Sequence, residues 1–251
     1  MQPVLSFCLV LLGLLTTSVA KHDDQLWPFG KHLNKGDNNQ YKDCNSVRKA
    51  GYNDSGVYMV WYNSTTPYKV VCNHTADNSF TIIQRRMYGD VNFNRGWQDY
   101  VYGFGHPQGD FWAGLNSIYY STLTGQIKMT VYMQDFQGIG GYIKYDYFKL
   151  NGPEDQYRLL IANAFGNVPD DLGYNDKSCF YTYDRPDPNN CARNMMAGWW
   201  YNYCTLAHPN GYHYPYGPYT PSTGYYNGIF WKDWLGFGYS LKFISMTLSD
   251  Q

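Results

Sequence analysis

The chain has 251 residues, of which 44% are hydrophobic, 19% aromatic and 16% charged, with 19 Lys and Arg residues against 20 Asp and Glu residues. This near-neutral balance argues against a nucleic-acid clamp and a polybasic membrane surface, because both need a positive field. With 27 Tyr and 8 Trp residues, the composition is that of a folded chain with an unusually large aromatic content.

Residues 1–20 are predicted to be a signal peptide that is removed on secretion. An apolar run from Val4 to Leu15 precedes the small residues Ser18-Val19-Ala20, which suit a signal peptidase, and the run is short for a membrane span. An uncleaved anchor is the alternative. No later stretch has the length of a membrane-spanning run, so we expect a secreted, extracellular protein without a membrane span.

A polar N-terminal arm is expected at residues 21–42 and a single domain at 43–251. Runs rich in β-branched and aromatic residues predict strands, and aromatic residues at three- and four-residue spacing predict two short helices, at 96–102 and 111–119. Residues 166–237, rich in Gly, Pro, Asn, Asp and Tyr, predict a long loop region of functional importance. The expected strands are 57–62, 68–72, 80–85, 127–136, 142–150, 157–162 and 239–248.

The cysteines and the glycosylation sequons agree with secretion. Cys8 leaves with the signal peptide, so five cysteines remain, an odd number in an oxidising compartment. No two of them have the spacing of a zinc-binding pair. Three Asn-x-Ser/Thr sequons, at Asn53, Asn63 and Asn73, are predicted glycosylation sites, although each one taken singly could be buried and unused.

Several short motifs occur in a fixed order between residues 43 and 248. They include Asp43-Cys44, Thr81-Ile82-Ile83-Gln84-Arg85-Arg86, Phe111-Trp112-Ala113-Gly114, Asn190-Cys191-Ala192, Gly198-Trp199-Trp200-Tyr201, Asn210-Gly211 and Tyr239-Ser240-Leu241-Lys242. In this order and spacing the chain resembles the fibrinogen-related domain, the C-terminal module of fibrinogen chains, ficolins, tachylectins, tenascins and angiopoietins. The resemblance implies an α+β fold with a central, twisted, mainly antiparallel sheet, short helices and a loop-rich C-terminal subdomain that binds ligands.

The resemblance also implies two disulfides, Cys44–Cys72 and Cys191–Cys204, each closing a short loop. The resemblance assigns Cys179 to neither of these disulfides. One interpretation is a buried, unreactive thiol, and the other is an intermolecular bridge that makes a disulfide-linked dimer.

In the family, a loop ahead of the second disulfide holds calcium with alternating Asp residues and carbonyl oxygens. The corresponding segment here is 182–191, in which Pro186 interrupts the pattern and only Asp184 and Asp187 remain as carboxylate donors. Because Ca²⁺ takes six to eight oxygen ligands, the expectation is an Asx/Pro turn, with Ca²⁺ binding as the alternative cofactor.

The lectin members of the family have an acetyl-binding pocket beside this loop. Its Tyr and His positions fall on Met195 and Thr205 in this chain, while Tyr225 and Phe237 keep aromatic walls. The acidic residue with which fibrinogen receives its peptide knob is missing here, since Tyr226 stands near its place, so fibrin-type polymerisation is not expected. A cleft lined by aromatic rings can still stack on a sugar or hold an acetyl methyl group.

The run 207–219 is rich in Tyr and His. It predicts either an adaptable recognition surface or a Pro-pinned loop that packs its own rings. His208 and His213 lack the spacing of a metal-binding pair.

Enzyme signatures such as Gly-x-Ser-x-Gly, His-Glu-x-x-His and a phosphate-binding glycine loop do not occur, and Asp170-Asp171 is expected in a turn, so we expect no enzyme. The leading hypothesis is a secreted lectin that binds acetylated or other carbohydrate, free or on a cell-surface glycoprotein, in innate-type recognition. The alternative is an extracellular signalling or matrix protein that binds a protein receptor through the same face.

Overall fold

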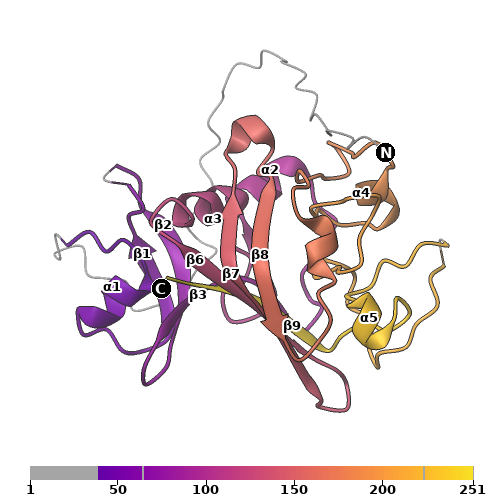
Figure 1. The fold of residues 1–251 in the computed structure, drawn as a ribbon, viewed down its shortest axis with the longest axis horizontal. Helices are drawn as coiled ribbons and strands as arrows, with labels where there is room; N and C mark the ends of the chain where they lie inside the picture. The colour runs from indigo at the N-terminus through magenta and orange to yellow at the C-terminus, as the bar shows by residue number, and fades with distance from the viewer. Residues whose placement is uncertain (1–38, 64, 223, 251) are drawn as a thin grey trace.

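An antiparallel sheet organises the computed structural model, which describes residues 39–63, 65–222 and 224–250 (Figure 1). All pairings between its strands are antiparallel. The strands are β1 (Gly56–Val60), β2 (Tyr68–His74), β3 (Ser79–Arg86), β4 (Phe104–Gly105), β5 (Phe111–Trp112), β6 (Ile127–Gln134), β7 (Gly140–Leu150), β8 (Leu159–Gly166) and β9 (Phe243–Asp250).

The main path of the sheet runs β1-β2-β3-β9-β6-β7-β8. The C-terminal strand β9 therefore lies in the middle, hydrogen-bonded to β3 on one side and to β6 on the other. Short β5 pairs with β3 and β4. Because the last strand completes the centre of the sheet, the sheet joins parts of the chain that are far apart in sequence.

Strand β6 shows how the sequence divides the two faces of the sheet. Ile127, Met129, Val131 and Met133 are all buried, whereas Tyr132 between them is 43% exposed. This is the alternation that a strand with one buried face requires. The α+β fold class is confirmed, and all seven expected strands are present with shifted ends.

Short helices connect and cover the strands. They are α1 (Cys44–Lys49), α2 (Trp97–Tyr102), α3 (Leu115–Ser121), α4 (Cys191–Asn194) and α5 (Lys232–Leu235), with 3₁₀ turns η2 (Pro153–Asp155) and η3 (Leu172–Asn175). Helix α1 was not predicted. It begins with a capping box, in which the Asp43 carboxylate accepts from Ser46 N at 2.6 Å and Ser46 Oγ accepts from Asp43 N at 3.1 Å.

The predicted helix over 111–119 was wrong in its first part. Phe111 and Trp112 form β5, pairing with Arg85 and Gln84 of β3, and the helix starts only at Leu115. Both aromatic side chains are fully buried, so tertiary packing outweighs the helical spacing of these residues.

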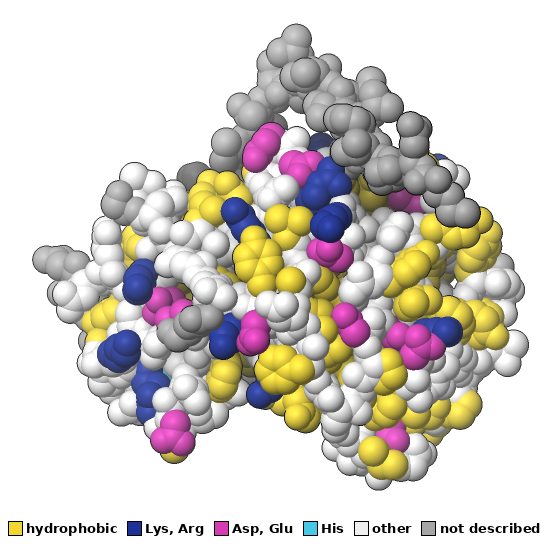
Figure 2. All heavy atoms as spheres, viewed as in Figure 1, with side chains coloured by type: hydrophobic (Ala, Val, Ile, Leu, Met, Phe, Trp, Pro, Cys, Tyr) yellow, Lys and Arg dark blue, Asp and Glu magenta, His cyan; other side chains and the backbone are white. Residues whose placement is uncertain are grey.

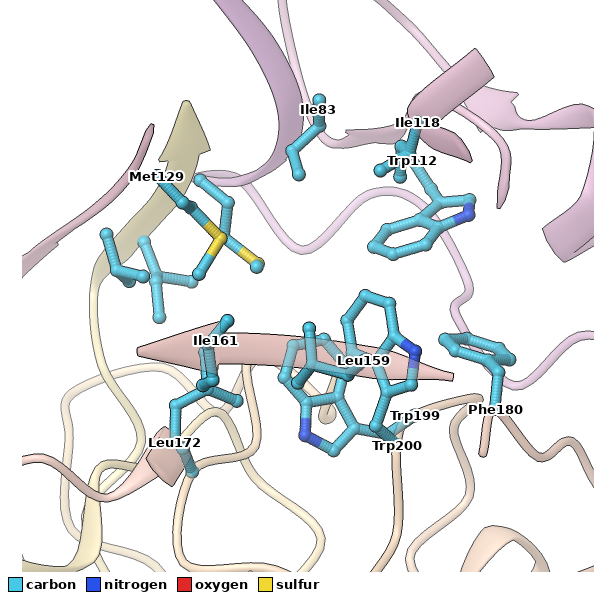
Figure 3. Close-up of a cluster of buried hydrophobic side chains, with 14 of the residues drawn as sticks. Ile83, Trp112, Ile118, Met129, Leu159, Ile161, Leu172, Phe180, Trp199 and Trp200 are labelled. Atoms are coloured by element: carbon cyan, nitrogen blue, oxygen red, sulfur yellow. The ribbon is translucent and has the colours of Figure 1, made fainter. Parts of the chain in front are cut away.

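The core lies between the inner face of the sheet and the segments that cover it (Figure 3). Its largest fully buried side chains include Trp112, Trp199, Trp200 and Phe180, whose rings contact one another at centroid distances of 4.9 to 5.9 Å. Much of the aromatic content of the chain is thus used to fill the interior beneath the C-terminal loops.

Residues 167–242 form the loop-rich end of the domain, with η3, α4 and α5 as their helical segments. Their orange and yellow loops lie at the opposite end of the molecule from the indigo α1 and β1 (Figure 1). Within the described part of the chain, no helix has the length and apolar character that crossing a bilayer demands.

Candidate functional site

The loop-rich end carries a group of aromatic side chains that we call the tyrosine face. It consists of Tyr212, Tyr214, Tyr219, Tyr225, Tyr226 and Phe237. Tyr212 is 60% exposed, Tyr225 47% and Tyr226 42%, and the other three are partly buried. Rings with one buried side and one exposed side are typical of binding surfaces, because they contribute contact area at low entropic cost.

The rings of the tyrosine face contact one another in a chain. Tyr214 stacks on Tyr219 with a centroid distance of 4.1 Å and an interplanar angle of 8°. Tyr212 meets Tyr214 edge-on at 4.7 Å, and Tyr219 meets Tyr226 at 6.1 Å. Tyr226 then stacks on Phe237. The run 207–219 therefore packs its own rings, as one of the two interpretations predicted, and a recognition role for its exposed rings stays a prediction.

Backbone hydrogen bonds join the two loop segments that carry these rings. Tyr212 and Gly228 form a bridge, in which Tyr212 N donates to Asn227 O at 2.7 Å. The phenolic groups add to it, because Tyr214 donates to Asn227 Oδ1 at 2.9 Å and Tyr219 accepts from Gly228 N at 2.8 Å. The face is thus held by hydrogen bonds at its base, which lowers the cost of ordering it on binding.

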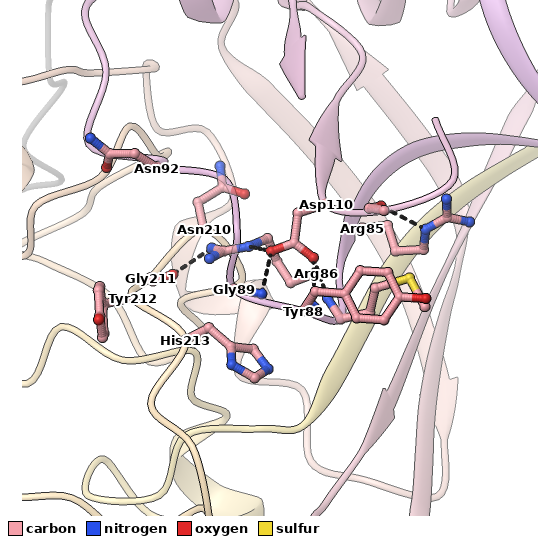
Figure 4. Close-up of polar contacts among 12 residues, drawn as sticks. Arg85, Arg86, Tyr88, Gly89, Asn92, Asp110, Asn210, Gly211, Tyr212 and His213 are labelled. Carbon is pink, nitrogen blue, oxygen red and sulfur yellow. Dashed lines mark hydrogen bonds and ion pairs between the residues drawn. The ribbon is translucent and has the colours of Figure 1, made fainter. Parts of the chain in front are cut away.

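A buried ion pair anchors the tyrosine face to the sheet (Figure 4). Asp110 accepts from Arg86 Nε at 3.1 Å and from the backbone amides of Met87, Tyr88 and Gly89 at 2.6 to 3.0 Å. Arg86 also donates to the carbonyl of Gly211. The Arg86 side chain therefore links strand β3 to Gly211, the residue that immediately precedes Tyr212.

Burial would raise the pKa of Asp110, but the amide of Tyr88 and the charge of Arg86 outweigh it and hold that pKa below its usual range. The carboxylate is therefore ionised at neutral pH, as a buried pair with Arg86 requires.

A hollow of about 400 Å³ adjoins Tyr212. The lining includes the buried side chains of Arg86, Asn210 and Asn227, and the 41% exposed Met196. Amide, guanidinium and thioether groups around a small hollow suit a polar side chain or a stretch of peptide backbone. The sequence carries no signal for this hollow, because its walls come from segments more than one hundred residues apart in the chain.

His208 lies beneath the tyrosine face, fully buried. Its Nδ1 is 3.0 Å from Gly228 O, and because a carbonyl only accepts, Nδ1 carries the proton. Nε2 lies 3.0 Å from the hydroxyl oxygen of Tyr201, which is also 2.9 Å from Ala197 O, so the single hydroxyl proton is shared between these two acceptors. Burial lowers the pKa of His208 to about 4, although the bond to Gly228 acts in the opposite direction, so the ring is neutral at pH 7.

The five pocket positions taken from the family separate into two groups. Tyr225, Tyr226 and Phe237 lie on the surface, and the last two are in contact. Met195 and Thr205 are each only 5% exposed, and Thr205 Oγ accepts from Ala207 N at 3.1 Å. The structure therefore brings the aromatic positions together and places the other two in the interior; a ligand role for the surface group stays a prediction.

The carboxylates of Asp184 and Asp187 are both engaged within the chain. Asp184 accepts from Trp97 N and from Thr182 Oγ, and Asp187, 4% exposed, accepts from Asn189 N and Ala192 N. Among the described residues no group of three His, Cys, Asp or Glu side chains could hold a metal ion. The bond from Asn189 N to Asp187 is that of an Asx turn, and calcium binding by this segment stays a prediction.

The two disulfides implied by the family resemblance are confirmed. Cys44 is bonded to Cys72, with Cα atoms 5.4 Å apart, and Cys191 to Cys204, with Cα atoms 5.1 Å apart. Cys179 is buried at 2% exposure, with its Sγ 3.8 Å from Asp155 O, and a dimer through it stays a prediction. Residues 1–38, which include the predicted signal peptide, Cys8 and most of the arm, lie outside the described residues.

Asp170 and Asp171 lie in the loop directly before η3, and Asp171 has an additional contact. It is 1% exposed, and its Oδ2 accepts from Asp233 N at 2.8 Å at the start of α5. Its Oδ1 has no hydrogen-bond partner. Burial, followed by the nearby Asp233 carboxylate, raises the pKa of Asp171 to about 7. The sequence offered no signal for this contact, because the two residues are distant in the chain.

A one-sided antiparallel sheet, two disulfides that close short loops and a loop-rich end with exposed rings define a disulfide-bonded globular domain whose prominent surface is aromatic. On the side seen in Figure 2, acidic and basic side chains are interspersed among hydrophobic ones. The chain belongs to the family described as the C-terminal globular domain of fibrinogen beta and gamma chains, whose model matches residues 40–251.

The most similar proteins agree with this assignment. Fibrinogen-like protein 1 of Homo sapiens is 35% identical, covering 86% of this chain and 77% of its own length. The fibrinogen-like globe domain of human ANGPTL2 superimposes with a TM-score of 0.79 at 34% identity, covering 83% of this chain and 98% of that one. A lamprey fibrin D-dimer complexed with the peptide Gly-His-Arg-Pro-amide gives a TM-score of 0.80 at 30% identity, covering 84% and 75%.

Proposed function

We propose that this chain is a secreted protein that binds a protein partner through its tyrosine face, as an extracellular signalling or matrix component. The observation that carries the proposal is the row of half-exposed rings from Tyr212 to Phe237, fixed by backbone pairing and bordered by a polar hollow. Aromatic side chains supply most of the binding energy at protein interfaces when they are held in place.

The relatives support this class of function over the lectin hypothesis. They include angiopoietin-related proteins and a microfibril-associated glycoprotein, and one solved structure of the family contains a peptide ligand. The disulfides are those expected of a secreted domain. The family relationship also supports a binding role over an enzymatic one.

Carbohydrate binding is the second candidate. Exposed phenol rings such as those of Tyr225 and Tyr226 can stack on a sugar ring and hydrogen-bond to its oxygens. The interior positions of Met195 and Thr205 count against an acetyl pocket of the lectin type.

A binding assay separates the two candidates. Fluorescently labelled protein is applied to fixed cells or extracellular matrix that is untreated, protease-treated or enzymatically deglycosylated, with and without excess N-acetylglucosamine. We expect binding to be lost after protease treatment and to survive deglycosylation and free sugar. Loss of binding with free sugar or after deglycosylation would overturn the proposal in favour of a lectin. Binding that survives protease treatment, deglycosylation and free sugar, and that is unchanged in the Tyr225→Ala and Tyr226→Ala variants, would show that this face is not used.

A further inference from the structure

The outer face of the sheet contains a groove of about 950 Å³, whose lining includes no residue of the tyrosine face. The floor is formed by side chains of β1, β2, β3, β9 and β6, among them Val71, Phe80, Ile82 and Phe243. Phe80 and Phe243 are only partly buried, and Tyr132 at the margin is 43% exposed. Partly exposed aromatic rings around a groove of this volume offer a surface on which an attached group can pack.

Asn73 lies within this apolar floor. Side chains two residues apart on a strand share a face, so Asn73 of β2 faces the groove together with Val71. The pairing of β2 with β3 sets Asn73 directly opposite Phe80. Asn73 is exposed, its Oδ1 accepts from Ser55 Oγ at 3.3 Å, and Thr75, the third residue of its sequon, lines the same groove.

The other two sequons differ in position. Asn63 follows β1, and its Oδ1 accepts from Thr65 N at 3.1 Å and Thr65 Oγ at 3.0 Å. Asn53 precedes β1 and is exposed, and Asp54 and Ser55 of its sequon line the margin of the groove. Neither asparagine lines the groove. A sugar on Asn73 would therefore start inside the groove, whereas one on Asn63 would start outside it.

We propose that Asn73 carries an N-linked oligosaccharide whose first sugars lie in the groove and cover its apolar floor. The attachment joins Asn73 Nδ2 to the anomeric carbon of an oligosaccharide carried on a lipid pyrophosphate. The anomeric C–O bond of that donor breaks, the lipid pyrophosphate leaves with the bonding electrons, and the displaced Nδ2 proton passes to a base. The Asn73 amide is the only part of this chain that changes.

Covalent attachment explains why a sugar rather than a free partner fills this groove. A tethered group has a high effective concentration at the surface beside it, so weak contacts suffice to hold it there. The apolar faces of sugar rings pack on aromatic rings such as Phe80 and Tyr132, and their hydroxyls can meet Ser245 and Thr247 of β9. The sequons lie at the end of the molecule opposite the yellow loops of the tyrosine face, which such a sugar leaves open (Figure 1).

The test uses the protein secreted from cultured eukaryotic cells. Glycopeptide mass spectrometry gives the occupancy of Asn73 and Asn63, and the release of each glycan by peptide N-glycosidase is timed on the folded protein. We expect Asn73 to be occupied and its glycan to be released severalfold more slowly than the glycan on Asn63, with the difference lost after denaturation. An unmodified Asn73, or equal release rates from the folded protein, would overturn the proposal.

A matched pair of variants adds a second measurement. Asn73→Gln is expected to increase the fluorescence of a hydrophobic dye such as anilinonaphthalene sulfonate severalfold, whereas Asn63→Gln leaves it unchanged. Equal fluorescence from the two folded variants would contradict a covered floor. If Asn73→Gln is not secreted, the dye fluorescence is followed while peptide N-glycosidase releases the glycans from the folded wild-type protein, and it should rise with the release from Asn73 and not with the release from Asn63.

Discussion

The ring of Phe237 stacks on the ring of Tyr226, with centroids 5.7 Å apart and planes inclined by 21°. Phe237 also contacts the buried Phe230 edge-on at 5.1 Å, so the exposed Tyr226 rests on a ring that is itself held by the core. This contact restricts the orientation of the Tyr226 ring at the surface.

The first prediction concerns this pair. Tyr226→Ala removes an exposed ring and is expected to weaken binding to the untreated cells or matrix described above by about 1 to 3 kcal/mol, without loss of folding, because hot-spot aromatics contribute about that much. Tyr147→Ala, on the remote strand β7 and 37% exposed in the wild type, is the control. Equal binding by both variants would show that the tyrosine face is not the binding surface.

Substitution of Gly211 tests the base of the tyrosine face. A Cβ there would overlap the carbonyl of Gly228, which belongs to backbone and cannot move aside easily. Gly211→Ala is therefore expected to destabilise the fold by about 1 to 3 kcal/mol, as overpacking does. Gly140→Ala is the control, because its Cβ would meet only Met133 O at 3.9 Å. Unfolding in urea measures both, and similar midpoints would contradict the packing described.

Removing Asp110 from the buried ion pair should destabilise the fold more than removing Arg86. Asp110→Ala leaves Arg86 and three backbone amides without their acceptor, and should cost about 3 to 5 kcal/mol of unfolding free energy. Arg86→Met should cost less, because Asp110 keeps its amide donors. Chemical denaturation of the two variants under the same conditions decides, and a larger loss for Arg86→Met would be the contrary result.

His208 should make stability depend on pH. The unfolded chain takes up the His208 proton near pH 6.5 and the folded chain at about 4, so between these values the unfolded state binds more protons and stability falls as pH decreases. The shift corresponds to ~3 kcal/mol. Denaturant titrations from pH 7.5 to 4 should show a flatter loss for His208→Gln than for the wild type. An identical pH dependence would mean that the histidine is accessible to protons in the folded state.

Asp171 should act in the opposite direction. Its folded pKa of about 7 lies above the ordinary value of 3.8, so the folded state binds more protons in this window, and this contribution to stability is lost as pH rises from about 4 to 7. Asp171→Asn keeps an acceptor for Asp233 N and removes the titration. The variant should therefore gain stability relative to the wild type as pH rises through this window, and a constant difference would contradict the assignment.

The sequence by itself determined the strands and the family. Alternation in β6 follows from residue order alone, because successive side chains on a strand point to opposite faces. The family resemblance implied the pairing of Cys44 with Cys72 and of Cys191 with Cys204. It also indicated the aromatic positions Tyr225, Tyr226 and Phe237.

Tertiary structure decided which residues share a surface. Phe111 and Trp112 became a strand because β3 and β4 were available to pair with them. Met195 and Thr205 entered the interior, and Asp171 met α5, through contacts between distant segments. The open groove around Asn73 exists only because β9, the last strand, completes the sheet between β3 and β6. Residue order fixes which face a strand side chain occupies, but not which other segments cover that face.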